Sequence, residues 1–166
     1  MGIRVPEPTV PLTLAAKVRV IYGDTDRMGV VYHGTYLRYL EHSRVEFMRK
    51  LGAVYAEMER QGMGLPVTEL GIRYLASARY DDLVSVHVGV SKLGFARLDF
   101  VYKLVVEPGD RFVGPDETPL KEPLVVGYAE SRHGCMTLDE GRITRLPEAL
   151  HACISQHLQS VEVTED

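Results

Sequence analysis

The sequence predicts an α+β fold in which one long helix packs against the concave side of a curled antiparallel sheet of about five strands. Apolar residues recur every three or four positions in one long segment near the N-terminus, and in alternate positions in several later segments. The predicted order is a strand, the long helix and then a run of strands. Strands that follow one another directly pair in antiparallel fashion, so this order favours the α+β class.

The first half of the chain contains the predicted helix. Residues 14–22 alternate loosely and suit a strand that ends at the turn Gly23-Asp24. Gly52 ends the helical pattern that follows, and a shorter helical piece is expected over 54–61. The apolar face of the long helix is predicted to present Tyr36, Leu40, Ser43, Phe47 and Leu51.

The second half of the chain is predicted to form most of the sheet. Residues 84–90 and 98–104 alternate strictly and are expected to pair as neighbours, joined near 92–94. Residues 66–76 and 124–132 are predicted as further strands. The Gly-, Pro- and Asp-rich segment 108–123 is expected to be a long loop, residues 139–141 a turn, and Pro147 the start of a terminal helix.

We expect an extended N-terminal tail over 1–12, one domain over 13–160 and a C-terminal tail over 161–166. The chain has 166 residues, of which 45% are hydrophobic and 25% charged, which is typical of a folded domain. With 19 Lys and Arg against 23 Asp and Glu, the net charge is −4, so no basic surface for nucleic acid or anionic membranes is expected.

The sequence also indicates a compartment. No apolar stretch approaches the roughly 20 residues that span a bilayer. The first residues contain three prolines and no apolar segment of the kind found in a secretory signal. The only two cysteines, Cys135 and Cys153, have no metal-ligand spacing and are weak evidence for a disulfide framework. We therefore expect a cytoplasmic protein with neither a metal nor a membrane span.

The segment 22–44 carries the chemistry that the sequence suggests. A loop is predicted to place Asp26 beside the start of the long helix near His33 and Gly34. The first N–H groups of a helix lack intrahelical partners and lie at the positive end of the helix dipole. Such a site can hold a carbonyl oxygen as it becomes an oxyanion, while a carboxylate attacks the carbonyl or activates water.

Simpler interpretations of the same residues stay open. Asp24 or Asp26 can form an Asx turn or cap the helix. His33 can be a helix cap or a partly buried, hydrogen-bonded histidine. Glu41 and Arg44, three positions apart, are most simply an ion pair.

This segment resembles the signature of the hot-dog-fold acyl-CoA thioesterases, specifically the 4-hydroxybenzoyl-CoA thioesterase group and its YbgC-type relatives. That group carries a D-x-D-x-x-G-x-V-x-[YH] pattern at the entry to the long helix. The resemblance extends over about 14–150, including A-S-A-R-Y-D-D at 76–82, and implies that 13–160 is a single hot-dog thioesterase domain. The residues that fall on the pattern are Asp24, Thr25, Asp26, Gly29, Val31, Tyr32, His33, Tyr36 and Glu41.

The resemblance implies a role for each site residue. Asp26 corresponds to the catalytic carboxylate, as nucleophile or general base, whereas Asp24 shapes the loop. The backbone N–H of His33 polarises the thioester carbonyl, and its imidazole assists. Glu41 reaches the acyl group from the neighbouring subunit. The remaining residues expected to contact substrate are Gly29, Val30, Tyr32, Gly34, Ser77 and Arg79.

The implied reaction is hydrolysis of an acyl or aryl thioester to the free acid and CoA, without any cofactor besides the CoA of the substrate. The acyl group is left open, as is the choice between CoA and an acyl carrier protein. A homodimer is implied, with a tetramer as the favoured assembly. Basic contacts for the nucleotide of CoA could come from Arg79, Lys92, Arg97 and Arg132.

Two alternatives and one departure from the pattern remain. A hot-dog hydratase or dehydratase would require a different spacing, because Asp26 and His33 are seven residues apart. A non-catalytic acyl-CoA-binding module would normally carry a DNA-binding segment, and none is evident. The segment 107–123 is longer than the tight hairpin expected of a compact YbgC-type protein, and either covers the acyl pocket or decorates the surface.

Overall fold

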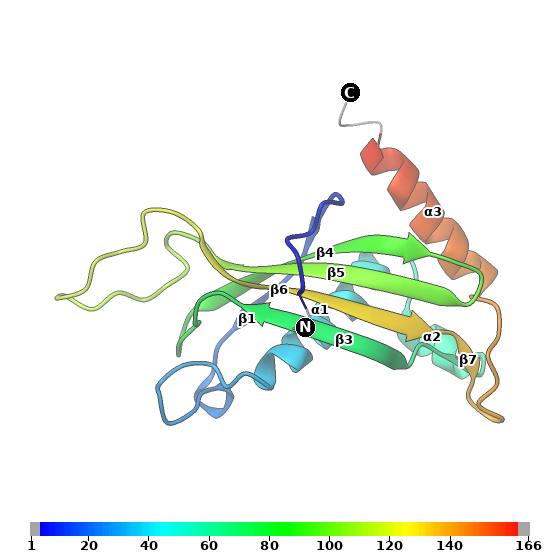
Figure 1. Cartoon of the computed structure of the whole chain (residues 1–166), viewed down its shortest axis with the longest axis horizontal. Coiled ribbons are helices and arrows are strands. Elements are labelled where there is room, and N and C mark those ends of the chain that lie inside the picture. Colours follow the sequence, from blue (N-terminus) through cyan, green and yellow to red (C-terminus); the bar gives the residue numbers. More distant parts are fainter. Residues whose placement is uncertain (1–3, 163–166) are drawn as a thin grey trace.

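The computed structural model describes residues 4–162, so residues 1–3 and 163–166 of the expected tails lie outside the described residues. A five-stranded antiparallel sheet has the strand order β1-β4-β5-β6-β3 (Figure 1). Its strands are β1 (Thr13–Arg19), β3 (Val67–Tyr74), β4 (Leu83–Leu93), β5 (Arg97–Val106) and β6 (Leu124–Gly134). The predicted class and the antiparallel sheet of about five strands are confirmed.

Helix α1 (Thr35–Lys50) covers one face of this sheet and lies behind it in Figure 1. Four residues of its predicted apolar face are buried, whereas Leu51 is the C-cap and is partly buried. The Phe47 ring meets Phe100 of β5 edge-on, with 6.2 Å between the ring centroids. The alternation that predicted β4 and β5 has the same origin, because every second residue of these strands points into this core. The core therefore lies between α1 and the sheet.

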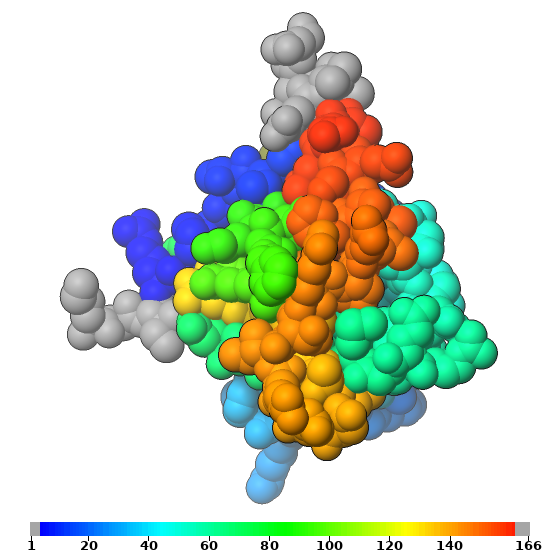
Figure 2. Space-filling view, turned by 90° about the vertical axis from the view of Figure 1, so that its right-hand side faces the viewer, coloured from blue at the N-terminus to red at the C-terminus, as the bar shows by residue number. Residues whose placement is uncertain are grey.

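The N-terminal segment crosses the opposite face of the sheet. Figure 2 shows it on the other side of the sheet from α1, and in Figure 1 it passes in front of the strands. Val5 is buried, and the Lys103 ammonium donates to the Glu7 carboxylate over 3.3 Å. A Cβ atom at Gly89 would lie 2.6 Å from the carbonyl oxygen of Pro11, so only glycine lets the segment approach β4 this closely.

Smaller elements surround this framework. Helix α2 (Tyr55–Arg60) is followed by β2 (Met63–Gly64), which pairs with β7 (Met136–Thr137) in a separate two-stranded sheet that the sequence did not predict. Helix α3 (Glu148–Glu162) begins directly after Pro147, as expected. It has 15 residues and is nearly as long as α1, which has 16. Within residues 4–162, every helix is too short or too polar to cross a bilayer.

Three loops gather at one end of the sheet, at the left of Figure 1. The first, residues 20–34, joins β1 to α1 and includes the short 3-10 helix η1 (Tyr22–Asp24). The second, residues 75–82, joins β3 to β4, and the third, residues 107–123, joins β5 to β6. The residues predicted to perform chemistry lie mostly in the first two of these loops.

Candidate active site

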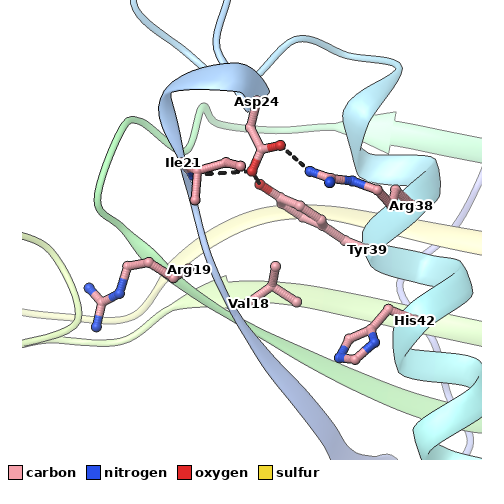
Figure 3. Close-up of a pocket in the computed structure, with 7 residues that line it drawn as sticks. All are labelled: Val18, Arg19, Ile21, Asp24, Arg38, Tyr39 and His42. Atoms are coloured by element: carbon pink, nitrogen blue, oxygen red, sulfur yellow. Dashed lines mark hydrogen bonds and ion pairs between the residues drawn. The ribbon is translucent and has the colours of Figure 1, made fainter.

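Asp24 anchors the first loop to the long helix. Its carboxylate is buried and accepts hydrogen bonds from the Tyr39 hydroxyl at 2.7 Å and from the backbone N–H of Ile21 at 3.2 Å (Figure 3). The guanidinium of Arg38 pairs with its other oxygen. Burial, followed by the neighbouring Asp24 carboxylate, raises the pKa of Tyr39 above its usual value. Asp24 therefore has a structural role, and all of its contacts are consistent with shaping the loop.

A cavity of about 300 Å³ opens beside this anchor, between β1 and α1. Asp24, Tyr39 and His42 line it together with residues of β1 (Figure 3). The guanidinium of Arg19 points away from the other lining side chains and donates to the Asp81 carbonyl at 2.6 Å. The cavity lies at the β1 edge of the sheet, opposite the β3 edge.

Asp26 lies in a tight turn two residues after the anchor. Its Oδ1 accepts a 2.8 Å hydrogen bond from the N–H of Met28, and its backbone N–H donates to the carbonyl of Val30 at 2.9 Å. Gly29 has a φ of 76°, a conformation that glycine adopts without strain, and its N–H donates to the Asp26 carbonyl. The Asx turn expected as a simpler interpretation thus exists, and it fixes the half-buried Asp26 carboxylate in position.

The start of α1 is attached to the same loop. The N–H of Tyr32 donates to the Asp24 carbonyl at 2.9 Å, and the Thr35 hydroxyl approaches the same oxygen at 3.4 Å. Gly34 is the N-cap of α1; it makes no side-chain cap, and the first turn contains no acidic residue. The positive end of the α1 dipole is therefore not neutralised by the helix's own residues.

His33 is exposed and held in place through its backbone. Its carbonyl accepts a 2.8 Å hydrogen bond from the Tyr74 hydroxyl at the end of β3. Its imidazole lies 4.2 Å, between ring centroids, from the Tyr32 ring, and both rings are exposed. The helix start is consequently tied to the β3 edge of the sheet.

The second loop contacts the first along its length. Val30 pairs with Arg79 in an isolated antiparallel bridge, and the N–H of Val31 donates to the Ala78 carbonyl at 2.9 Å. The N–H of Ala78 in turn donates to the hydroxyl of Tyr36 on α1 at 3.2 Å. Ser77, next to Ala78, is exposed.

The structure thus gathers most of the predicted site residues on two adjoining loops and the helix start. These are Asp26, Gly29, Val30, Tyr32, His33, Gly34, Ser77 and Arg79. Glu41 is not among them. It is exposed on α1, seven residues beyond Gly34 and so about 10 Å along the helix axis.

The side chain of Arg79 already has a partner. Its guanidinium forms a two-pronged ion pair with Glu117 of the third loop. Nearby, Arg111 of the same loop pairs with the buried Asp82 and donates to the Ser77 carbonyl at 3.2 Å. The long loop therefore packs against the segment that supports the Asp26 turn.

The expected ion pair between Glu41 and Arg44 is wrong. Within residues 4–162, Glu41 forms no ion pair, and Arg44 faces the buried hydroxyl of Tyr102 on β5. Arg44 lies toward the sheet side of the helix, whereas Glu41 is exposed to solvent, so the two side chains diverge.

Sequence reasoning missed several residues that position the site. Arg38 and Tyr39 hold Asp24, Tyr74 holds His33, and Arg111 holds the second loop. Tyr39 carried a usable signal, since it lies on the predicted helix and a tyrosine hydroxyl that becomes buried normally requires a polar partner. Within the described residues, no group of three His, Cys, Asp or Glu side chains is placed to hold a metal ion.

A curled antiparallel sheet packed on a long helix, with a carboxylate held in a turn of the loop that leads into that helix, is the arrangement expected of a hot-dog protein. Comparison with known proteins agrees. Residues 20–154 match the Thioesterase-like superfamily. The chain therefore belongs to the Thioesterase-like superfamily, and the predicted family and enzyme class are confirmed.

Individual relatives cover almost the whole domain. The acyl-CoA thioesterase YbgC of Haemophilus influenzae is 39% identical over 86% of this chain and 93% of its own length. The 1,4-dihydroxy-2-naphthoyl-CoA hydrolase of Thermosynechococcus vestitus is 26% identical over 89% of this chain and 92% of its own. The crystal structure of a DHNA-CoA thioesterase from Staphylococcus aureus superposes with a TM-score of 0.75 at 27% identity, covering 91% of this chain and 93% of that one.

Proposed function

We propose that the protein hydrolyses an acyl-CoA or aryl-CoA thioester to the free acid and CoA, with Asp26 as the catalytic carboxylate. The observation that carries this proposal is the placement of Asp26 in a hydrogen-bonded turn beside the uncapped N-terminus of α1. The names of the YbgC and 1,4-dihydroxy-2-naphthoyl-CoA relatives support CoA thioesters as the substrate class.

The reaction adds one water molecule across the C–S bond. The thioester carbonyl lies against the N–H of His33 at the helix start, where the helix dipole stabilises the negative charge that develops on oxygen. As a general base, Asp26 takes a proton from water, whose oxygen bonds to the carbonyl carbon. The C–S bond then breaks, and the proton ends on the thiolate that leaves. As a nucleophile, Asp26 would instead form an anhydride that water cleaves, with the same products.

Other site residues shape the space around that carbonyl. The backbone at Gly29, Val30 and Gly34 lets the substrate approach closely, and the exposed rings of Tyr32 and His33 offer an apolar surface with polar edges. We propose that Ser77 lines the acyl pocket and that Arg79 contacts the phosphates of CoA. No cofactor is needed for this chemistry, because water and the carboxylate supply every group that reacts.

We further propose a homodimer formed through β3, which is an edge strand of the sheet. Three exposed apolar residues lie on β3 and a fourth follows it directly. An open strand edge with exposed apolar residues favours pairing with a second copy of the chain. These residues are Val67, Leu70, Tyr74 and Leu75. Such a dimer would place the Tyr74–His33 contact close to the partner, where the partner's α1 could contribute Glu41; two dimers could then form the expected tetramer.

A cytoplasmic location is also part of the proposal. Cys135 and Cys153 are both free, and Cys135 is fully buried. Burial raises the pKa of the Cys135 thiol, which disfavours the reactive thiolate. Free thiols of this kind suit a reducing compartment.

Thiol release from a panel of acyl-CoA and aryl-CoA substrates tests the function. Asp26→Asn should lower kcat by at least about 100-fold, because the change removes the charge and keeps the shape. Asp139→Asn is the matched control: Asp139 also accepts from a following backbone N–H, at 2.7 Å, and is exposed far along the chain in a surface turn. Near-normal turnover of a folded Asp26→Asn protein would contradict the mechanism.

A further inference from the structure

The third loop is fastened to the second by two ion pairs of different character. Arg111 and Asp82 form the inner pair, with Nη2–Oδ2 and Nε–Oδ1 distances of 2.6 and 2.9 Å and side-chain exposures of 15% and 0%. Arg79 and Glu117 form the outer pair, with Nη1–Oε1 and Nη2–Oε2 distances of 2.6 and 3.1 Å and exposures of 35% and 44%. The buried pair is a permanent anchor, whereas the exposed pair can exchange with ligands from solvent.

The Glu117 carboxylate accepts from both terminal nitrogens of the Arg79 guanidinium and is held in that position by other contacts of the loop. Its Oε2 also accepts a 2.8 Å hydrogen bond from the N–H of Gly114, and the Phe112 carbonyl accepts from Nη2 of Arg79 at 2.9 Å. The Arg79 guanidinium, followed by the Gly114 hydrogen bond, lowers the pKa of Glu117. A charged carboxylate in this two-pronged arrangement presents oxygens to arginine much as a phosphate does.

Arg79 lies next to the proposed catalytic turn. It pairs through its backbone with Val30, and the carbonyl of Val30 accepts from the N–H of Asp26 at 2.9 Å. If the carbonyl of a thioester substrate lies at this turn, the CoA part of that substrate can therefore reach the second and third loops. An open cavity of about 430 Å³ lies beside the third loop and is lined by Asp81 and Asp110 as well as by Arg19 and Arg111. Both of these arginines are paired with aspartates, so the cavity offers space but no free positive charge beyond the fork of Arg79.

We infer that Glu117 is a specificity-determining residue, because it competes with the phosphate groups of a CoA substrate for the guanidinium of Arg79. This inference rests on the proposed function and adds to it a preference between thioesters with and without phosphate groups. Binding of a thioester that carries phosphates requires Arg79 to exchange Glu117 for the substrate. Binding of a thioester without phosphates does not. Glu117 thus lowers the preference of the enzyme for nucleotide-bearing thioesters.

Glu117→Gln tests this competition, since it removes the charge and keeps the shape. KM for an acyl-CoA should fall about two- to fivefold, the range that one exposed ion pair gives, with kcat unchanged. KM for the N-acetylcysteamine thioester of the same acyl group, which has no phosphate, should not change. In an Arg79→Gln background the Glu117→Gln effect on acyl-CoA should disappear. Glu57→Gln is the matched control, because Glu57 pairs with Arg60 at 2.7 Å on exposed α2.

A purely structural role for the pair gives a different pattern. If Glu117 only holds the loop, Glu117→Gln would change KM equally for both substrates or would leave both unchanged, and either result overturns the inference. Calorimetric titration with CoA itself separates this test from the proposed function, because no turnover is required. If Glu117→Gln binds CoA more tightly but the wild type hydrolyses no thioester, Glu117 competes with CoA for Arg79 and the proposed function is wrong. If the wild type hydrolyses thioesters but Glu117→Gln binds CoA with unchanged affinity, the proposed function stands and the competition is excluded.

Discussion

The hydroxyl of Tyr39 donates a 2.7 Å hydrogen bond to the buried carboxylate of Asp24, fifteen residues earlier in the chain. Through this contact the middle of α1 holds the loop on which Asp26 lies. Arg38 supplies the compensating positive charge from the preceding position of the helix. The loop that carries the proposed catalytic carboxylate is therefore anchored by a residue in the middle of the helix.

Tyr39→Phe should destabilise the protein, because it removes the shorter of the two hydrogen bonds to Oδ2 of the buried Asp24 carboxylate and leaves only the 3.2 Å bond from the N–H of Ile21. Hydrogen bonds to charged groups are worth about 1.5–3 kcal/mol, so the free energy of unfolding should fall by that amount. Urea denaturation followed by circular dichroism measures the change. Tyr22→Phe, at a tyrosine that is 75% exposed, is the control and should have little effect. Equal stability of the two variants would show that the Asp24 contact contributes nothing.

The two proposed catalytic residues should differ in importance. His33→Ala removes the imidazole and keeps the backbone N–H at the helix start, so it should lower kcat about tenfold, less than Asp26→Asn. Steady-state kinetics of both variants with the best substrate of the panel measures the ranking. His42→Ala, at an exposed histidine farther along α1, serves as control. A larger loss from His33→Ala than from Asp26→Asn would make the histidine the principal base.

Stability should fall in acid because of one buried histidine. Nδ1 of His133 lies 3.0 Å from the Leu65 carbonyl, which can only accept, so Nδ1 carries the hydrogen. Nε2 must then accept from the Ser131 hydroxyl at 2.8 Å, and Ser131 accepts from Tyr102. This chain of hydrogen bonds requires a neutral imidazole, and burial lowers the pKa of His133 from 6.5 to about 4.

The sign of the pH effect follows from that shift. Between pH 6.5 and about 4, the unfolded chain binds a proton at His133 that the folded protein does not. The contribution of His133 to the free energy of unfolding is therefore fully present above pH 6.5 and is lost as the pH falls toward 4. The loss is on the order of 3 kcal/mol. Urea midpoints measured between pH 7.5 and 4 for the wild type and His133→Gln should converge in acid. Parallel curves for the two proteins would exclude His133 as the cause.

Sequence periodicity predicted the elements that repeat one pattern over many residues. The three- and four-residue spacing from Tyr36 to Leu51 predicted α1, and the alternation over 84–90 and 98–104 predicted β4 and β5. The pairing of β2 with β7 could not be predicted in this way, because each strand has only two residues and too few positions to show a period.

The sequence motif of the candidate site was predictable, whereas the residues that hold the motif in place were not. Asp26, His33 and the helix start lie within one short segment, so their order along the chain already indicated that one loop carries all three. The Arg111–Asp82 and Arg79–Glu117 pairs join positions 29 and 38 residues apart. Charged residues at such separations have no local pattern that selects one partner over another, and only the gathering of three loops at one end of the sheet brings these together.

The active site is expected to be shared between two subunits. Glu41 is exposed on α1 and distant from the Asp26 turn of its own chain, so a role in catalysis requires it to act from the partner in a dimer paired through β3. We expect Asp26→Asn and Glu41→Ala each to inactivate the protein. Mixing the two variants with subunit exchange should then restore activity, because a mixed dimer has one site with Asp26 from one chain and Glu41 from the other. An equal mixture contains about one quarter of the wild-type number of intact sites.

A variant with both changes in one chain provides the matched control for this experiment. In a dimer of that variant with a wild-type chain, each site lacks one of the two residues if the site is shared, so no activity should come from the mixed dimer. If Glu41 acts within its own chain, the outcome is reversed: the mixed dimer with the wild type keeps one intact site, whereas mixing the two single variants restores nothing. Differently tagged chains purified by two successive affinity steps isolate the mixed dimers, and thiol release from each preparation decides between the two arrangements. A monomer in sedimentation velocity at the assay concentration, with full activity, would exclude a shared site altogether.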